Sequence, residues 1–99
     1  MNTVIATRHP ALVQYLIEEG IITAEEAQNV VTHATPEVVK DKRVIGVLPI
    51  HLAALASTYA NIAIFTPPEL RGVELTLEQV KQYAQPMVEY KVAIFPAYL

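Results

Sequence analysis

The sequence contains no cysteine, and only three of its 99 residues are glycine. The lack of cysteine excludes a disulfide framework, a zinc ribbon and thiol catalysis, and it suits a cytoplasmic protein. The scarcity of glycine excludes the glycine-rich loops of dinucleotide-binding and Walker-type sites. Neither NAD nor ATP is indicated and no metal-ligand spacing stands out, so we expect no cofactor.

Basic residues are also scarce. Seven Lys and Arg against ten Asp and Glu give a formal net charge of −3, whereas proteins that follow long DNA or RNA need a basic face for many phosphate contacts. No uninterrupted apolar run approaches the roughly 18 residues of a membrane span, and the start of the sequence lacks the pattern of a signal peptide. We expect a soluble, cytoplasmic protein that binds neither a membrane nor long nucleic acid. A compact anion could still be held by a few well-placed groups.

Apolar residues are abundant: 53% of the residues are hydrophobic and 17% are charged. A chain of 99 residues can enclose one core, so we expect a single domain over residues 1–99, with 93–99 as a C-terminal tail of unassigned role. The apolar surplus favours burial of some surface against a second copy, and we expect a homodimer.

Four short apolar stretches rich in β-branched residues are typical of strands covered on both faces of a sheet. They are Thr3–Ala6, Asn29–Thr32, Arg43–Val47 and Asn61–Phe65.

Helix signals lie between these stretches. The first helix is predicted over Pro10–Gly20, where glycine is the stop, and the second over about Pro49–Ser57. A third begins after Thr76, which forms a capping box with Gln79, and Pro86 should kink or end it. Alternating strands and helices predict a parallel sheet with right-handed crossovers. We therefore predict an α/β fold, a small Rossmann-like doubly wound sheet that is mostly parallel, with about four strands in order 2-1-3-4 and flanking helices.

Two strand-to-helix junctions are built alike. In the predicted order the first and third strands are neighbours at the switch point where open α/β sheets bind ligands. Each strand is followed by a proline-initiated helix, whose N-terminus would present unpaired N–H groups and the positive end of its dipole to a phosphate. The candidate ligand contacts are the residues of both junctions, Thr7, Arg8, His9, Pro10, Gly46, Val47, Leu48 and Pro49.

Three of these residues have distinct chemistry. Arg8 could clamp a phosphate with two hydrogen bonds, and His9 could donate or accept a proton near neutral pH. Gly46 would let the backbone approach the ligand closely. The junctions therefore indicate an anionic small ligand that carries phosphate.

Three further residues are weaker candidates. His51 lies in the first turn of the second helix, where a histidine often only makes a local hydrogen bond, and His33 ends the second strand. Arg71 follows the fourth strand at the same edge of the sheet, although a surface ion pair with Glu69 or Glu74 would also explain it.

The same segments resemble a known family. Thr7-Arg8-His9-Pro10, then Gly46–Ala54, then Pro68–Leu75 look like the signature of the Csx family numbered sixteen, a small CRISPR-associated family found beside type III systems. The resemblance runs from Thr3 to about Val92. It departs at Ala11, where a glycine is usual, and at Val47, where a hydroxyl residue is usual.

The resemblance implies a ring nuclease that removes cyclic tetra-adenylate, the second messenger of type III effectors, and so switches off the antiviral response. The implied chemistry is metal-independent attack of a ribose 2′-hydroxyl on the neighbouring phosphodiester. It implies catalytic roles for Arg8, His9 and His51, with Arg71 as a ligand contact. Two copies of Arg8, His9 and Arg71 would surround the two-fold symmetric ring in a homodimer.

Other classes of protein remain open at this point. The same crevice could bind the cyclic nucleotide without cutting it, as a sink or sensor. Arg8-His9 could also begin a histidine-phosphatase signature, but Pro10 stands where glycine is normal and that fold usually needs a longer chain. A structural adaptor that dimerises through its apolar surface is the third alternative.

Overall fold

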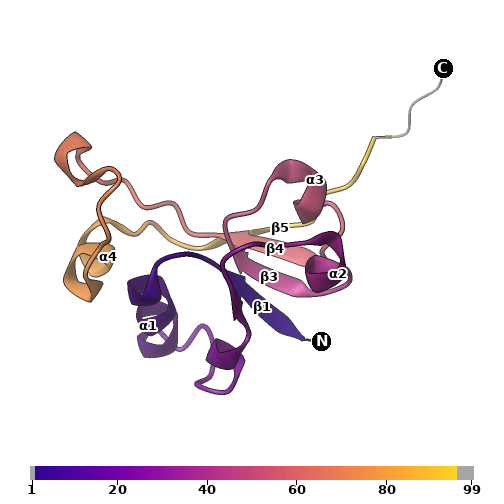
Figure 1. Ribbon diagram of the computed structural model, residues 1–99, viewed down its shortest axis with the longest axis horizontal. Coiled ribbons are helices and arrows are strands. Elements are labelled where there is room, and N and C mark those ends of the chain that lie inside the picture. The colour runs from indigo at the N-terminus through magenta and orange to yellow at the C-terminus, as the bar shows by residue number, and fades with distance from the viewer. Residues whose placement is uncertain (1, 96–99) are drawn as a thin grey trace.

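The computed structural model describes residues 2–95, so 96–99 of the predicted tail lie outside the described residues. One sheet contains β1 (Thr3–Ala6), β2 (Val30–Val31), β3 (Arg43–Gly46), β4 (Thr58–Asn61) and β5 (Val88–Tyr90). The strand order is β2-β1-β3-β4-β5, with the first three pairings parallel and the β4–β5 pairing antiparallel. The predicted α/β class, the mostly parallel sheet and the order of the first four strands are confirmed (Figure 1).

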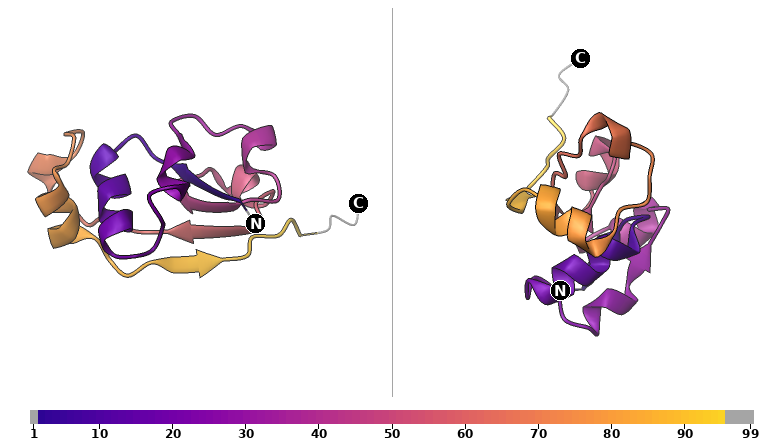
Figure 2. Two further views of the ribbon diagram at one scale, coloured as in Figure 1. Left: turned by 90° about the horizontal axis from the view of Figure 1, so that it is seen from below. Right: turned by 90° about the vertical axis from the view of Figure 1, so that its left-hand side faces the viewer.

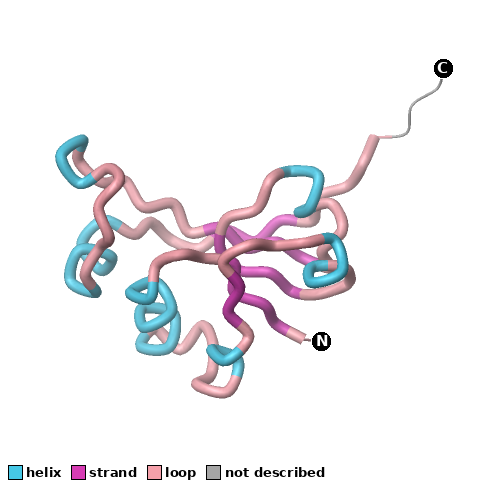
Figure 3. The backbone as a smooth tube through the Cα atoms, in the orientation of Figure 1, coloured by secondary structure: helices cyan, strands magenta, loops and turns pink. Residues whose placement is uncertain are grey.

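Helices cover both faces of this sheet (Figure 3). The α-helices are α1 (Pro10–Glu18), α2 (Pro36–Val39), α3 (Ile50–Ala53) and α4 (Leu77–Tyr83), and the 3-10 turns are η1 (Glu26–Gln28) and η2 (Pro68–Leu70). Figure 2 shows α1 and α4 side by side at one end of the molecule. Among residues 2–95, no helix is long and apolar enough to cross a membrane.

The two central strands, β1 and β3, are apolar because they are buried between two cores. Alternate residues of a strand point to opposite faces of the sheet. Ile5 and Ile45 are fully buried with Leu16 in the core beneath α1 and α4. Val44 is fully buried with Val39 in the core beneath α2 and α3. Both faces are therefore covered, as the near-continuous apolar strands predict.

The fourth strand lies earlier in the chain than we predicted. The expected strand was Asn61–Phe65, but the paired residues are Thr58–Asn61. These residues are more polar because Tyr59 and Asn61 both donate hydrogen bonds to the Gly46 carbonyl, at 3.1 Å each. After the strand, Ile62 and Ile64 pack into the core beneath α1 and α4, whereas Phe65 is exposed.

The helix after Pro49 is also shorter than predicted. It ends at Ala53, and turns carry the chain to Ser57, whose N–H donates to the Lys42 carbonyl at 2.7 Å. The chain must rejoin the sheet at Thr58, which leaves no room for the predicted extension to Ser57.

Toward the C-terminus, one prediction is confirmed and one strand was missed. The predicted capping box between Thr76 and Gln79 is confirmed, and α4 ends at Tyr83, before Pro86. The edge strand β5 was not predicted. Its Glu89 carboxylate accepts hydrogen bonds from the Thr58 hydroxyl at 2.9 Å and from Arg43 Nε at 3.2 Å, which ties β5 to the sheet.

Candidate functional site

The turn between β1 and α1 forms the centre of the candidate site. The Thr7 N–H donates to the Val31 carbonyl at 3.1 Å, and the His9 N–H donates to the Thr7 hydroxyl at 3.1 Å. The His9 carbonyl accepts from the Leu12 N–H at 3.0 Å as α1 begins. This tight path leaves Arg8 exposed and His9 half-buried at the carboxyl edge of the parallel strands.

Three depressions meet at this turn, and the described residues that line all three of them are Arg8 and His9. The first depression, of about 460 Å³, lies toward β2 and β3 and is also lined by Thr7, His33, Val47 and Pro49. The second, of about 820 Å³, lies toward the loop after β4 and is also lined by Val47, Asn61, Arg71 and Glu74. The third, of about 330 Å³, lies between α1 and β2 and is also lined by Pro10, Val13, Gln14 and Val30.

The charge at these depressions is mostly basic. No Asp or Glu lines the first or the third depression, whereas Arg8 lines both. Arg71 joins Arg8 at the second depression, where Glu74 is the acidic lining residue. The ion pairs within residues 2–95 are Arg43–Glu89 and Lys81–Glu18, so the surface ion pair considered for Arg71 is not formed there. Both arginines are available to an anion.

The His9 ring is an unusual N-cap. Its side chain makes no capping hydrogen bond, and its Nδ1 atom is buried with no hydrogen-bond partner among the described residues. A buried polar atom left without a partner costs about 1–3 kcal/mol, and such groups concentrate at functional sites. No hydrogen bond within the described fold fixes the tautomer of His9 at Nδ1.

The junction between β3 and α3 is closed by internal hydrogen bonds. The Val47 N–H donates to the Ala6 carbonyl at 3.1 Å, and the Leu48 N–H donates to the Tyr59 hydroxyl at 3.0 Å. Pro49 has no N–H. The N–H groups of Val47 and Leu48 are therefore already bonded, and Val47 and Pro49 contribute walls to the first depression.

Gly46 is required by the neighbouring strand rather than by a ligand. Its φ is +135°, and a Cβ atom at this position would lie 2.0 Å from the Ala6 carbonyl oxygen. The close approach is therefore between β3 and β1. Leu48, the next candidate, is buried in the core beneath α2 and α3.

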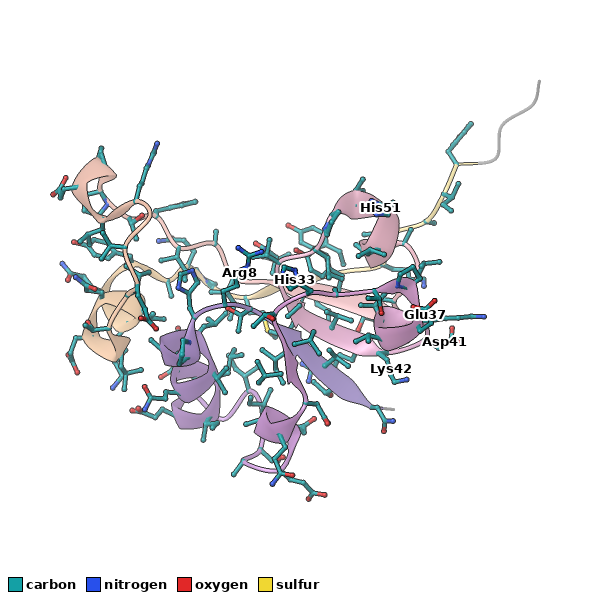
Figure 4. All side chains as sticks on the ribbon, viewed as in Figure 1. Arg8, His33, Glu37, Asp41, Lys42 and His51 are labelled. Carbon is teal, nitrogen blue, oxygen red and sulfur yellow. The ribbon has the colours of Figure 1, made fainter. Side chains whose placement is uncertain are left out.

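The histidines are not placed as the sequence suggested. His51 is exposed on α3 and lines none of the three depressions, although Val47 and Pro49 of the same junction do meet Arg8 and His9. His33 lines the first depression with Arg8, and Figure 4 shows both labels at this edge of the sheet. The signal for His33 was present, because it follows the strand predicted to lie next to β1.

Asn61 is a further residue that the sequence did not indicate. It lines the second depression, and its side-chain amide donates to the Gly46 carbonyl at 3.1 Å. Because the strand was placed three residues too late, Asn61 was expected at its start rather than at its carboxyl end, where functional side chains gather.

The part of the chain that the structure describes holds no group of three or more His, Cys, Asp or Glu side chains arranged to bind a metal ion. The charged and histidine side chains that line the three depressions are Arg8, His9, His33, Arg71 and Glu74.

The site can now be compared with known proteins. No curated protein and no solved structure is significantly similar to this chain. One family model, described as "Putative CRISPR-associated protein (Cas_VVA1548)", matches residues 4–93 and so covers both junctions and all three depressions. The chain belongs to this family of CRISPR-associated proteins.

Proposed function

We propose that the protein is a ring nuclease of type III CRISPR systems, which binds cyclic tetra-adenylate and cleaves it without a metal ion. One observation carries the proposal: Arg8 and His9, an anion-binding group and a proton-transfer group, are the residues at which all three depressions meet. A cyclic oligonucleotide alternates phosphates with riboses in its ring and carries a base on each ribose, so a site with several depressions around a basic centre suits it. Membership of a CRISPR-associated family agrees with this role.

The reaction that fits the site is internal transesterification. A ribose 2′-oxygen attacks the adjacent phosphorus, the bond from phosphorus to the 5′-oxygen breaks, and the products carry a 2′,3′-cyclic phosphate and a 5′-hydroxyl. The proton lost by the 2′-hydroxyl passes to a base, and the leaving 5′-oxygen takes up a proton. The attack is intramolecular, so the protein supplies alignment, charge stabilisation and proton transfer rather than a nucleophile.

The side chains divide this work by chemistry. Arg8 stabilises the charge on the phosphorane through its fork of N–H donors. His9 acts as the general acid or base, a role that typically contributes about 10²- to 10⁴-fold. Thr7 and Pro10 flank these groups and shape their depressions, and Arg71 binds a second phosphate across the second depression.

A homodimer would complete the site. Cyclic tetra-adenylate has a two-fold axis, and an isologous dimer would place two copies of Arg8 and Arg71 around one ring. The junction beside the first depression carries exposed apolar side chains, with Val47 71% and Ile50 73% exposed, which a second copy would cover.

The test is incubation of the purified protein with cyclic tri-, tetra- and hexa-adenylate in EDTA, with the products resolved by chromatography and mass. We expect cyclic tetra-adenylate to be converted to linear products that end in a 2′,3′-cyclic phosphate. Intact ring that stays tightly bound would instead identify a binding protein that sequesters or senses the messenger. This alternative is favoured by the same basic, acid-free first depression, because binding an anion does not require cutting it.

A further inference from the structure

The third depression differs from the other two in the character of its walls. Apart from the shared turn, it is lined by Pro10, Val13 and Val30, together with Gln14 and Thr32, and its surface is almost wholly apolar. At about 330 Å³ it lies at the small end of the range of small-molecule sites. Mostly apolar walls with a few polar groups at the rim are typical of a site for a flat, partly polar ring.

The Gln14 side chain is available to hydrogen-bond a ligand in this depression. Pro10 and Gln14 are four residues apart on α1, so they lie on the same side of the helix, one turn from each other. Gln14 is exposed, and its side chain makes no hydrogen bond with the described residues. An unpaired amide on an exposed helix face is ordinary. An unpaired amide at the rim of an apolar depression beside an unpaired arginine is a recognition group.

We propose that the third depression is a nucleobase subsite that selects adenine, and that Gln14 is its specificity-determining residue. The inference rests on the proposed function for the ligand, an adenylate whose phosphate is bound by Arg8. The base would pack between Pro10 and Val30 while the Gln14 amide pairs with its edge.

The choice of adenine follows from hydrogen-bond complementarity. A glutamine amide presents one acceptor and one donor side by side, which matches the N6 donor and N7 acceptor of adenine. Guanine presents two acceptors at the corresponding positions, so the glutamine oxygen would face an oxygen. Uracil is smaller and would fill less of the apolar wall. The continuity of this slot with Arg8 supplies the neighbouring phosphate site, and no acidic residue lines the slot to repel the phosphate.

The experiment uses two linear dinucleotides, ApA and GpG, which share one phosphodiester and differ in the hydrogen-bonding edges of their purine bases. Each is titrated into the isotope-labelled protein while the backbone amides and the Gln14 side-chain amide are followed by NMR. We expect saturable shifts at Val13, Gln14 and Val30 with ApA, at an affinity about fivefold or more above that for GpG. The Gln14→Ala variant should lose most of that difference.

The matched control is Gln82→Ala, which removes an exposed glutamine from α4, where no depression is lined by it. Its ApA-to-GpG affinity ratio should equal that of the wild type. The subsite is overturned if ApA leaves Val13, Gln14 and Val30 unshifted, if ApA is not preferred over GpG, or if Gln14→Ala behaves as Gln82→Ala does. Cleavage of cyclic tetra-adenylate is measured separately on the same variants. Cleavage that survives without base selection disproves only the subsite, and base selection without cleavage disproves only the nuclease.

Discussion

The junctions after β1 and β3 have the same sequence plan and different structures. Both run from a buried strand through a short turn to a proline and a helix. After β1 the turn leaves Arg8 exposed and the Nδ1 atom of His9 without a partner. After β3 the Gly46 carbonyl and the Leu48 N–H are bonded to Tyr59. Backbone N–H groups are bonded in both junctions, so the two differ in their side chains. In the junction after β1, called the open junction, Arg8 is exposed and the His9 Nδ1 atom has no partner among the described residues, whereas Tyr59 ties down the junction after β3, called the scaffold junction.

The largest effect should come from breaking the scaffold junction at Gly46. In Gly46→Ala the new methyl group meets the Ala6 carbonyl oxygen at 2.0 Å, and the φ of +135° is strained for alanine. We expect a loss of about 3 kcal/mol or more in the free energy of unfolding, measured by urea denaturation. Gly20→Ala is the control, because Gly20 also has a positive φ but has nothing within 4 Å of the added atom. Equal losses in both variants would show that the strand contact is unimportant.

The next largest effect, a loss of cleavage rate, should come from removing the positive charge of Arg8 in the open junction. Arg8→Ala should lower the single-turnover cleavage of cyclic tetra-adenylate at least tenfold, or about 1.4 kcal/mol in the barrier, with the unfolding midpoint unchanged. Arg8→Lys should recover only part of this rate, since lysine lacks the fork of donors. Lys40→Ala, which removes an exposed charge from the end of α2, is the control and should cleave at the wild-type rate.

Tyr59→Phe should remove hydrogen bonds from the scaffold junction without introducing a steric clash. The change leaves the Leu48 N–H without its acceptor, while the Gly46 carbonyl keeps the Asn61 donor. We expect a loss of about 1–2 kcal/mol in the free energy of unfolding. Tyr15→Phe removes a tyrosine hydroxyl that makes no hydrogen bond with the described residues and should be nearly neutral. A neutral Tyr59→Phe would show that the junction does not depend on this bond.

The smallest loss of stability should come from Glu89, whose hydrogen bonds to Thr58 and Arg43 hold the edge strand β5 against the sheet. The Thr58 hydroxyl, and then the Arg43 guanidinium, hold the pKa of Glu89 below its ordinary value. A lowered folded-state pKa stabilises the fold above the unfolded-state pKa, and this contribution is lost as the pH falls through the folded-state value. Glu89→Gln should cost less than about 1 kcal/mol at neutral pH, because the pair is partly exposed, and the cost should disappear in acid. A cost that persists in acid would assign the effect to packing rather than charge.

The sequence predicted the fold better than it predicted the site, for a physical reason. Buried parallel strands are apolar on both faces, so β1 and β3 were recognised, and the Thr76 capping box marked the start of α4. The polar strand β4 was placed too late because Tyr59 and Asn61 are in the sheet to bond with Gly46, a long-range contact that has no local signature. The edge strand β5 did have a signature, the alternation of apolar and polar residues over Val88–Val92.

The site shows the same division between local and long-range information. Arg8 and His9 were identified because they follow a buried strand and precede a proline-initiated helix. His51 has the same local setting, and only the fold shows that it lines no depression while His33 does. The neighbouring strand in the sheet decides which donors are already hydrogen-bonded. The sequence alone does not show which residues lie on that strand opposite a given donor.

The most direct measurement compares the two junctions through their histidines. The single-turnover rate of cyclic tetra-adenylate cleavage in EDTA is measured for His9→Ala and His51→Ala, with unfolding midpoints as a check on the fold. The account predicts that His9→Ala loses at least about tenfold in rate, while His51→Ala loses much less. Wild-type turnover in His9→Ala together with a large loss in His51→Ala would place the chemistry at the junction after β3 and contradict it.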